Sequence, residues 1–207
     1  MPRGHDIETH ERVMNAAARL FAERGHAHVT IRDICALAHA NIAAVNYHFA
    51  SKDALYQEVI LRSIGGMRDI TARAIAAGEG LGAEDRLRAF IRVFLTATVS
   101  GEDAWVHQLL LREVSEPTPA LDRLVDDVVR PRLTYLREIA AELLGCPASD
   151  ARAMRCAFSI HAQCMALTNP SLTSRVAIAG SDADLHEHVN HITEFSLAGL
   201  WALARTT

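Results

Sequence analysis

Residues 30–52, TIRDICALAHANIAAVNYHFASK, predict two short helices joined by a tight turn, and this local pattern constrains the fold more than any other stretch. Thr30 and Asp33 have the spacing of a capping box, in which a hydroxyl and a carboxylate satisfy free N–H groups at a helix start. After one short amphipathic helix the apolar period breaks, and Asn41, a preferred N-cap residue, begins a second. Ser51 then caps a third helix.

The second of these helices has two different faces. Val45 and Phe49 can point into a core, together with Ala40 just before the helix. The opposite face carries small, apolar and amide side chains: Ile42, Ala43 and Asn46, with Tyr47 and His48 at the helix end. Asparagine can pair with the N6 and N7 atoms of adenine, and alanine or isoleucine can contact a thymine methyl group. This face is therefore predicted to lie in a DNA major groove.

Two basic residues flank this helix in suitable positions. Arg32, at the start of the preceding helix, can bond guanine O6 and N7 through both arms of its guanidinium group. Lys52 is predicted to direct its charge at a phosphate, next to the free N–H groups at the start of the third helix. The pattern indicates a helix-turn-helix.

Residues 9–56 resemble the DNA-binding domain of the TetR family of bacterial repressors. The resemblance rests on LFAERG, T-I-R-D-I, A-x-x-N, YHF and SKDALY, in this order and at the family's spacing. It implies a three-helix DNA-binding domain whose dimer binds double-stranded operator DNA. Carried over by position, the DNA-contact roles fall on Thr30, Arg32, Asn41, Ile42, Ala43, Asn46, Tyr47, His48 and Lys52.

Two positions depart from the family pattern. His39 stands where the family has a turn glycine, and a positive φ there would cost on the order of 1 kcal/mol. Asn46 stands where the family often has a tyrosine, with Tyr47 one place later. The base preference therefore cannot be transferred from other members.

Composition favours an all-α protein. Half of the 207 residues are hydrophobic but only 5% are aromatic, and no run alternates in the manner of a β-strand. The N-terminus has no apolar signal segment, and no stretch approaches the roughly 18 apolar residues of a membrane span. Four cysteines without C-x-x-C spacing are expected to be reduced thiols. We therefore expect a cytoplasmic protein.

Charge is unevenly distributed along the chain. The net charge is -4, but residues 1–52 hold six Lys and Arg against five Asp and Glu, which gives +1, and the rest holds 15 against 20, which gives -5. The sign of this asymmetry suits an N-terminal DNA-binding domain, although its size is small.

Helical periodicity continues to the C-terminus and predicts two domains. Residues 1–52 form the DNA-binding domain, a connector helix runs from about residue 52 to residue 77, and residues 53–207 form a larger effector-binding and dimerisation domain. Three glycines in residues 78–82 mark the clearest break. The last helix is apolar around much of its girth, so it requires partners on both sides. We expect a homodimer through the last two helices; burial inside one larger bundle is the alternative.

The C-terminal half also resembles one branch of the family, which includes regulators of efflux and antibiotic-sensitivity genes. The similar stretches are LLLREVSEPTPALDRLVDDVVRPRL, HAQCMALTNP and HITEFSLAGLWA. A pocket for a small, partly apolar effector is predicted, lined by Trp105, Gln108, Arg112, His161 and Cys164. The alternative is that these five are core or interface residues.

Other functional classes have less support. No phosphate-binding glycine loop, G-x-S-x-G or H-E-x-x-H occurs, so no catalytic residue is predicted. A metal- or thiol-responsive sensor on the same scaffold is the open alternative, from His186, His188 and His191, or from Cys156, His161 and Cys164. Neither group has the spacing of a closed zinc site, so no metal or cofactor is predicted. The sequence predicts an operator-binding repressor released by a small molecule.

Overall fold

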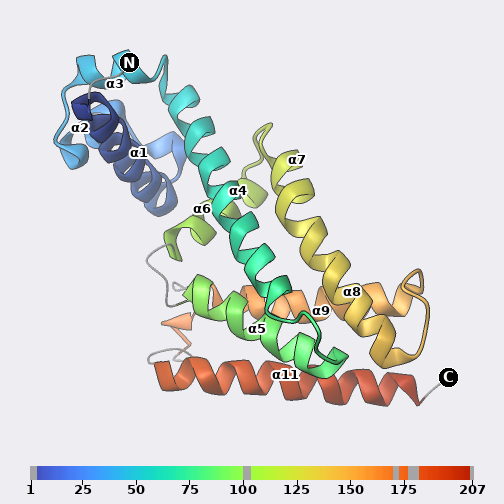
Figure 1. The fold of residues 1–207 in the computed structure, drawn as a ribbon. Coiled ribbons are helices and arrows are strands. Elements are labelled where there is room, and N and C mark those ends of the chain that lie inside the picture. Colours follow the sequence, from blue (N-terminus) through green and yellow to red (C-terminus); the bar gives the residue numbers. More distant parts are fainter. Residues whose placement is uncertain (1–3, 100–103, 170–172, 177–181, 206–207) are drawn as a thin grey trace. The chain divides into compact units, whose positions relative to one another are not determined.

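The computed structural model describes residues 4–99, 104–169, 173–176 and 182–205, and the regular elements of these ranges are all helices (Figure 1). The helices are α1 (Gly4–Arg24), α2 (Ile31–Ala38), α3 (Ile42–His48), α4 (Lys52–Ala76), α5 (Ala83–Val99), α6 (Ala104–Ser115), α7 (Leu121–Leu124), α8 (Arg130–Leu144), α9 (Ala151–Leu167) and α11 (Asp182–Ala204). The prediction of an all-α protein with a helix-turn-helix near its N-terminus is confirmed. None of the described helices is both long and apolar enough to cross a lipid bilayer.

The described contacts group the chain into two compact units. The first comprises residues 1–66 and 105–124, and the second comprises residues 67–104 and 125–207. Helix α6 thus packs with the N-terminal helices, and α4 contributes to both units. The predicted functional division into residues 1–52 and 53–207 remains a prediction, since it concerns function rather than packing.

In the first unit, α1 is longer than the sequence pattern indicates. It begins at Gly4 instead of near Thr9, and an ion pair of 3.3 Å between Glu8 and Arg12, one helical turn apart, supports the added turn. Its apolar face is fully buried around Phe21, whose ring meets that of Tyr56 edge-on at 5.1 Å. Gly25 ends the helix with φ 79°.

The second unit is a bundle in which α5, α8, α9 and α11 pack against one another (Figure 1). Phe90 and Phe94 of α5 stack at 6.1 Å in its core, and Leu136 of α8 is also fully buried. A π-helical turn, Val125–Val129, precedes α8, and Pro131 lies in the first turn of that helix. Because proline lacks an N–H donor, it is tolerated in the first turn of a helix, and helical structure runs from α7 through the π turn into α8 without a break.

Candidate nucleic-acid interface

The first helix of the motif begins at the predicted capping box. Thr30 donates its backbone N–H to Asp33 Oδ2 at 2.9 Å, and Thr30 Oγ1 accepts from Asp33 N at 3.2 Å. The bonds of Thr30 to Asp33 lower the pKa of the carboxyl group, so its charge is retained at neutral pH. Arg32 is exposed beside this cap and makes no ion pair or hydrogen bond with another described residue. Its guanidinium group is therefore available to a ligand.

The turn between α2 and α3 adopts the predicted left-handed geometry. His39 has φ 49° and ψ 45°, and it is the only non-glycine residue with positive φ in the described chain. Ala40 N–H donates to the Cys35 carbonyl at 3.0 Å, and from α1 Arg12 Nε donates to the Ala38 carbonyl at 3.3 Å. Asn41 Oδ1 then caps α3 by accepting from Ala44 N at 2.6 Å. Histidine thus replaces the glycine without loss of the turn.

Helix α3 buries one face and exposes the other. Val45 and Phe49 are 1% and 3% exposed, whereas Ile42 is 45% and Tyr47 is 79% exposed. Ala43 and Asn46 lie on the same exposed face. Ala40, which was expected to be buried, is only half-buried. The predicted reading surface is therefore exposed, although its contact with DNA stays a prediction.

His48 differs from its neighbours because it also packs. It is half-buried, and its ring lies edge-on to that of His10 at 5.6 Å. His10 in turn stacks on Phe49 at 4.8 Å, and its Nε2 atom lies 3.0 Å from Glu58 Oε1. Sequence reasoning did not identify the contacts of His10 with α3 or with Glu58. His10 lies more than 30 residues from each of these partners, so the contacts depend on how α1 packs against α3 and α4.

Lys52 also has a structural role. Its Nζ atom donates to the carbonyl groups of His26 at 2.9 Å and Val29 at 3.2 Å, which ties α4 to the segment before α2. Ser51 caps α4 by accepting from Ala54 N at 3.0 Å, as predicted. An ammonium group has three donors, so one remains for the predicted phosphate contact.

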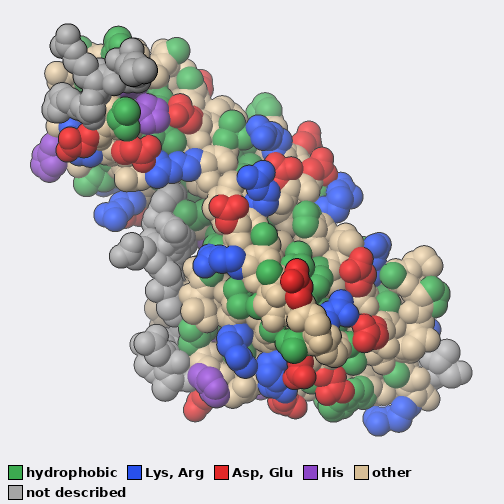
Figure 2. Space-filling model, viewed as in Figure 1, with side chains coloured by type: hydrophobic (Ala, Val, Ile, Leu, Met, Phe, Trp, Pro, Cys, Tyr) green, Lys and Arg blue, Asp and Glu red, His purple; other side chains and the backbone are tan. Residues whose placement is uncertain are grey.

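The visible surface shows no broad basic patch. In Figure 2, Lys and Arg side chains are interspersed with Asp and Glu side chains on the face that is drawn. This agrees with the small charge asymmetry of the sequence.

The predicted pocket residues lie in both units. Arg112 of α6 donates from Nε to the Ala22 carbonyl at 2.8 Å and from Nη2 to the Glu23 carbonyl at 2.9 Å, at the C-terminal end of α1. Gln108 is half-buried in the same unit, whereas His161 and Cys164 lie on α9 in the second unit. The side chain of Trp105 lies outside the described residues. A pocket formed by all five stays a prediction.

The described residues do not favour a metal sensor. They contain no group of three His, Cys, Asp or Glu side chains arranged to hold a metal ion. His186 instead bonds to Asn190 through Nδ1 at 3.1 Å, and all four cysteines are free thiols in the structure.

Comparison with family models assigns both halves of the chain. A model of the TetR family of bacterial regulatory proteins matches residues 13–59. A model of the C-terminal domain of the HTH-type transcriptional dual regulator CecR matches residues 83–200, which is more than half of the chain. A search of curated proteins found no match.

Solved structures share the fold at low sequence identity. A transcriptional regulator from Pseudomonas aeruginosa PAO1 is 23% identical with a TM-score of 0.70, over 93% of this chain and 90% of that one. A regulatory protein of the tetR family from Rhodococcus RHA1 is 19% identical with a TM-score of 0.72, over 93% and 96%. AibR, solved with isovaleryl coenzyme A and operator DNA, is 15% identical with a TM-score of 0.68, over 90% and 97%.

Proposed function

Because this chain belongs to the TetR family of bacterial regulatory proteins and carries a C-terminal domain of the CecR type, we propose that it is a homodimeric repressor released from operator DNA by a small-molecule effector. The observation that carries the DNA-binding part is the exposed face of α3. Ile42 and Tyr47 are large and exposed on a helix that is capped at Asn41 and held from behind by Val45 and Phe49. A rigid helix with such a face suits a major groove.

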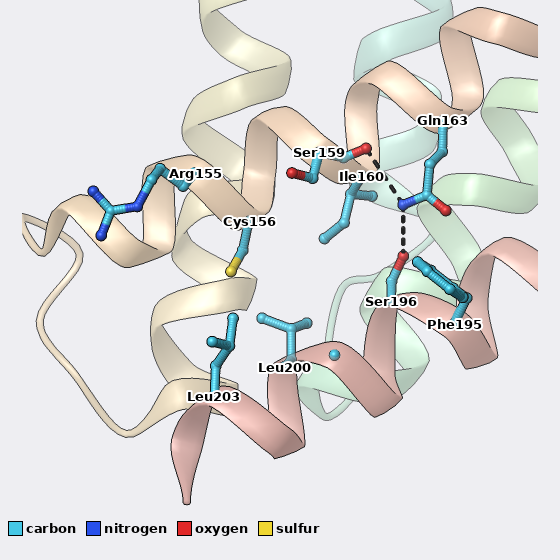
Figure 3. A pocket seen from close by; sticks show the side chains of 10 residues that line it. Arg155, Cys156, Ser159, Ile160, Gln163, Phe195, Ser196, Leu200 and Leu203 are labelled. Atoms are coloured by element: carbon cyan, nitrogen blue, oxygen red, sulfur yellow. Dashed lines mark hydrogen bonds between the residues drawn. The ribbon is translucent and has the colours of Figure 1, made fainter. Parts of the chain in front are cut away.

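The dimer would form through α9 and α11. A groove between these helices is lined by Cys156 and Ile160 of α9 and by Leu200 and Leu203 of α11 (Figure 3). Gln163 Nε2 of α9 links the two sides by donating to Ser196 Oγ of α11 at 3.5 Å, and it also donates to the Ser159 carbonyl of its own helix at 3.3 Å.

Large apolar side chains of the two helices that form this groove remain exposed in the single chain. Phe158 of α9 is 62% exposed and Phe195 of α11 is 63% exposed, with Met154, Trp201 and Leu203 between 37% and 43%. Exposed apolar side chains that gather into one large patch are typical of an interaction surface. A second copy of the chain would cover these side chains. It would also give α11, which is apolar around much of its circumference, a packing partner on its second side.

The operator would be a near-palindrome. A two-fold symmetric dimer places two copies of α3 in successive major grooves, one helical turn of roughly 34 Å or a multiple apart. An effector that favours a dimer with a different separation of the two α3 helices would release the DNA. A coupling of only about 1–3 kcal/mol suffices to change occupancy noticeably.

The effector would bind in the C-terminal domain. The AibR structure, which holds both an acyl-coenzyme A and operator DNA, supports a small-molecule effector on this fold. Our proposal keeps His161 and Cys164 as pocket residues and keeps Trp105, Gln108 and Arg112 as candidates. It includes no enzymatic activity, and it places the protein in the cytoplasm with its DNA.

The test is footprinting on the intergenic DNA beside the protein's own gene, with affinity measured across a salt series. We expect a protected near-palindrome and an affinity that falls steeply with salt. Arg32→Gln should weaken operator binding by about 1–3 kcal/mol. Arg123→Gln, the same change at an exposed arginine of α7, is the matched control and should bind as the wild type does.

A second variant tests the reading helix itself. Tyr47→Ala should weaken operator binding without lowering the unfolding temperature, because the side chain is 79% exposed. Unchanged protection by both Arg32→Gln and Tyr47→Ala would show that α3 does not read the operator. No protected site at any salt concentration would count against the DNA-binding proposal as a whole.

A further inference from the structure

One arginine of the second unit is buried among neutral groups. Arg132 of α8 is only 2% exposed. Its Nε atom donates to Thr71 Oγ1 at 2.7 Å, and its Nη2 atom donates to the Met67 carbonyl at 3.2 Å. Its guanidinium carbon lies 4.8 Å from the centre of the Phe94 ring. None of these three partners carries a charge.

This arginine also has no acidic partner among the described residues. Other arginines of the same unit pair with carboxylates: Arg86 with Glu142 at 2.9 Å and Arg88 with Glu194 at 2.8 Å. Burial lowers the pKa of Arg132 to about 10, which leaves the guanidinium protonated at neutral pH. A buried positive charge without an anion is unfavourable, so the site has an unmet electrostatic requirement.

The neighbouring titratable groups cannot supply the anion. Burial raises the pKa of the Cys164 thiol to about 12, and burial together with the charge of Arg132 lowers the pKa of His161 to about 4. Both side chains are therefore neutral at pH 7. His161 Nε2 is buried and has no hydrogen-bond partner among the described residues, and its ring lies 6.3 Å from the Phe94 ring. Like the guanidinium group of Arg132, this nitrogen atom of His161 therefore lacks a matching partner.

We propose that Arg132, with His161 beside it, binds the carboxylate of a small apolar organic acid, and that this acid is the effector. The carboxylate would neutralise the guanidinium and accept a hydrogen bond from His161 Nε2 in the tautomer that carries its proton there. Phe94, Met67 and Cys164 would contact the apolar part. The role of this acid as the effector rests on the proposed function, whereas its binding to Arg132 does not.

The position of Arg132 also suggests how binding would reach the DNA-binding helices. All of its hydrogen bonds, to Thr71 Oγ1 and to the carbonyl and sulfur atoms of Met67, go to α4, the helix that begins at Lys52 directly after the candidate reading motif. A carboxylate that draws the guanidinium group toward itself would weaken those bonds. The register of α8 against this end of α4 would then differ between the free and the bound protein.

Calorimetry on the full-length protein tests the binding. The probes are octanoate and benzoate, each compared with its neutral primary amide, octanamide or benzamide. We expect at least one acid to bind about tenfold or more tightly than its amide, since a charge-assisted pair replaces an uncompensated charge. Arg132→Gln should abolish this preference, and Arg88→Gln, at an arginine that already has a carboxylate partner, should keep it.

Folding of the variants is checked separately. In Arg132→Gln the hydroxyl of Thr71 still donates to the Met67 carbonyl at 2.9 Å, so α4 retains that bond. If this variant does not fold, Arg132→Lys keeps the charge and should keep the preference for the acid over the amide. Equal binding of acid and amide, no binding of either acid, or a preference that persists in Arg132→Gln would overturn the inference.

The two proposals can fail independently. A wild-type protein that protects its operator but does not distinguish acids from amides would retain the regulator proposal and lose the carboxylate site. A protein that binds an acid through Arg132 but protects no DNA would show the reverse. An acid that binds through Arg132 should also reduce operator protection, whereas its amide should not.

Discussion

Tyr56 donates a hydrogen bond from its hydroxyl group to Glu113 Oε2 at 3.0 Å, and this bond joins α4 to α6 inside the first unit. Glu113 is completely buried, and its other carboxylate oxygen accepts from Thr118 N at 2.8 Å and Thr118 Oγ1 at 2.6 Å. Burial and the adjacent Glu113 raise the pKa of Tyr56, so the hydroxyl keeps its proton. Arg112, which precedes Glu113 in the sequence, donates hydrogen bonds to two carbonyl groups at the C-terminal end of α1. Helix α6 is therefore fastened to α1 and α4, the helices that precede and follow the helix-turn-helix in the sequence.

Removing the Tyr56 hydroxyl should leave a buried carboxylate oxygen without its partner. We expect Tyr56→Phe to lower the free energy of unfolding by about 1–3 kcal/mol, measured by urea denaturation. Tyr47→Phe is the control, since its hydroxyl is on a side chain that is 79% exposed, and it should change little. Equal stability of the two variants would mean that the bond between α4 and α6 contributes nothing.

Gly25 tests the junction between α1 and Arg112. Its φ of 79° and ψ of 156° lie in a region that is almost exclusive to glycine, and an added Cβ would lie 3.2 Å from Arg112 Nη1. We expect Gly25→Ala to destabilise the protein by about 1–3 kcal/mol. Gly66→Ala lies in the middle of α4 with no atom within 4 Å of its new Cβ, and it should stabilise by roughly 0.5–1 kcal/mol. A stabilising Gly25→Ala would contradict the backbone argument.

Lys52 combines a structural contact with a proposed phosphate contact, and the two have different signatures. Lys52→Met should lower stability by about 0.5–1.5 kcal/mol for each bond to the His26 and Val29 carbonyls. If the third donor reaches a phosphate, the slope of log affinity against log salt should also fall by about 1. A salt slope equal to that of the wild type would restrict Lys52 to its structural role.

His161 should make the protein less stable in mild acid. Its pKa is about 4 in the folded protein, whereas the ordinary value for histidine is 6.5, so between these values the unfolded chain binds a proton that the folded chain does not. The contribution of His161 to the free energy of unfolding is therefore fully present above about pH 6.5. It falls as the pH drops toward 4, by at most about 3 kcal/mol. Urea unfolding of His161→Gln should show a smaller loss across this window. Parallel curves for the variant and the wild type would refute this.

The sequence by itself determined the features that depend on near neighbours. The capping box of Thr30 and Asp33, the caps at Asn41 and Ser51, and the left-handed turn at His39 are all set within a few residues. The burial of Val45 and Phe49 against the exposure of Tyr47 follows from helical periodicity. The fold class and the exposed face of α3 were therefore predictable.

Only the tertiary structure decided which partners the long polar side chains bind. Arg112 finds its carbonyl acceptors about 90 residues back in the chain, Arg132 finds Thr71 61 residues back, and Tyr56 finds Glu113 57 residues ahead. An arginine on an amphipathic helix has the same local pattern whether its guanidinium meets water, a carboxylate or a buried carbonyl. Its partner depends on which helices pack together, and that is set by the shape of the whole core rather than by spacing along the chain.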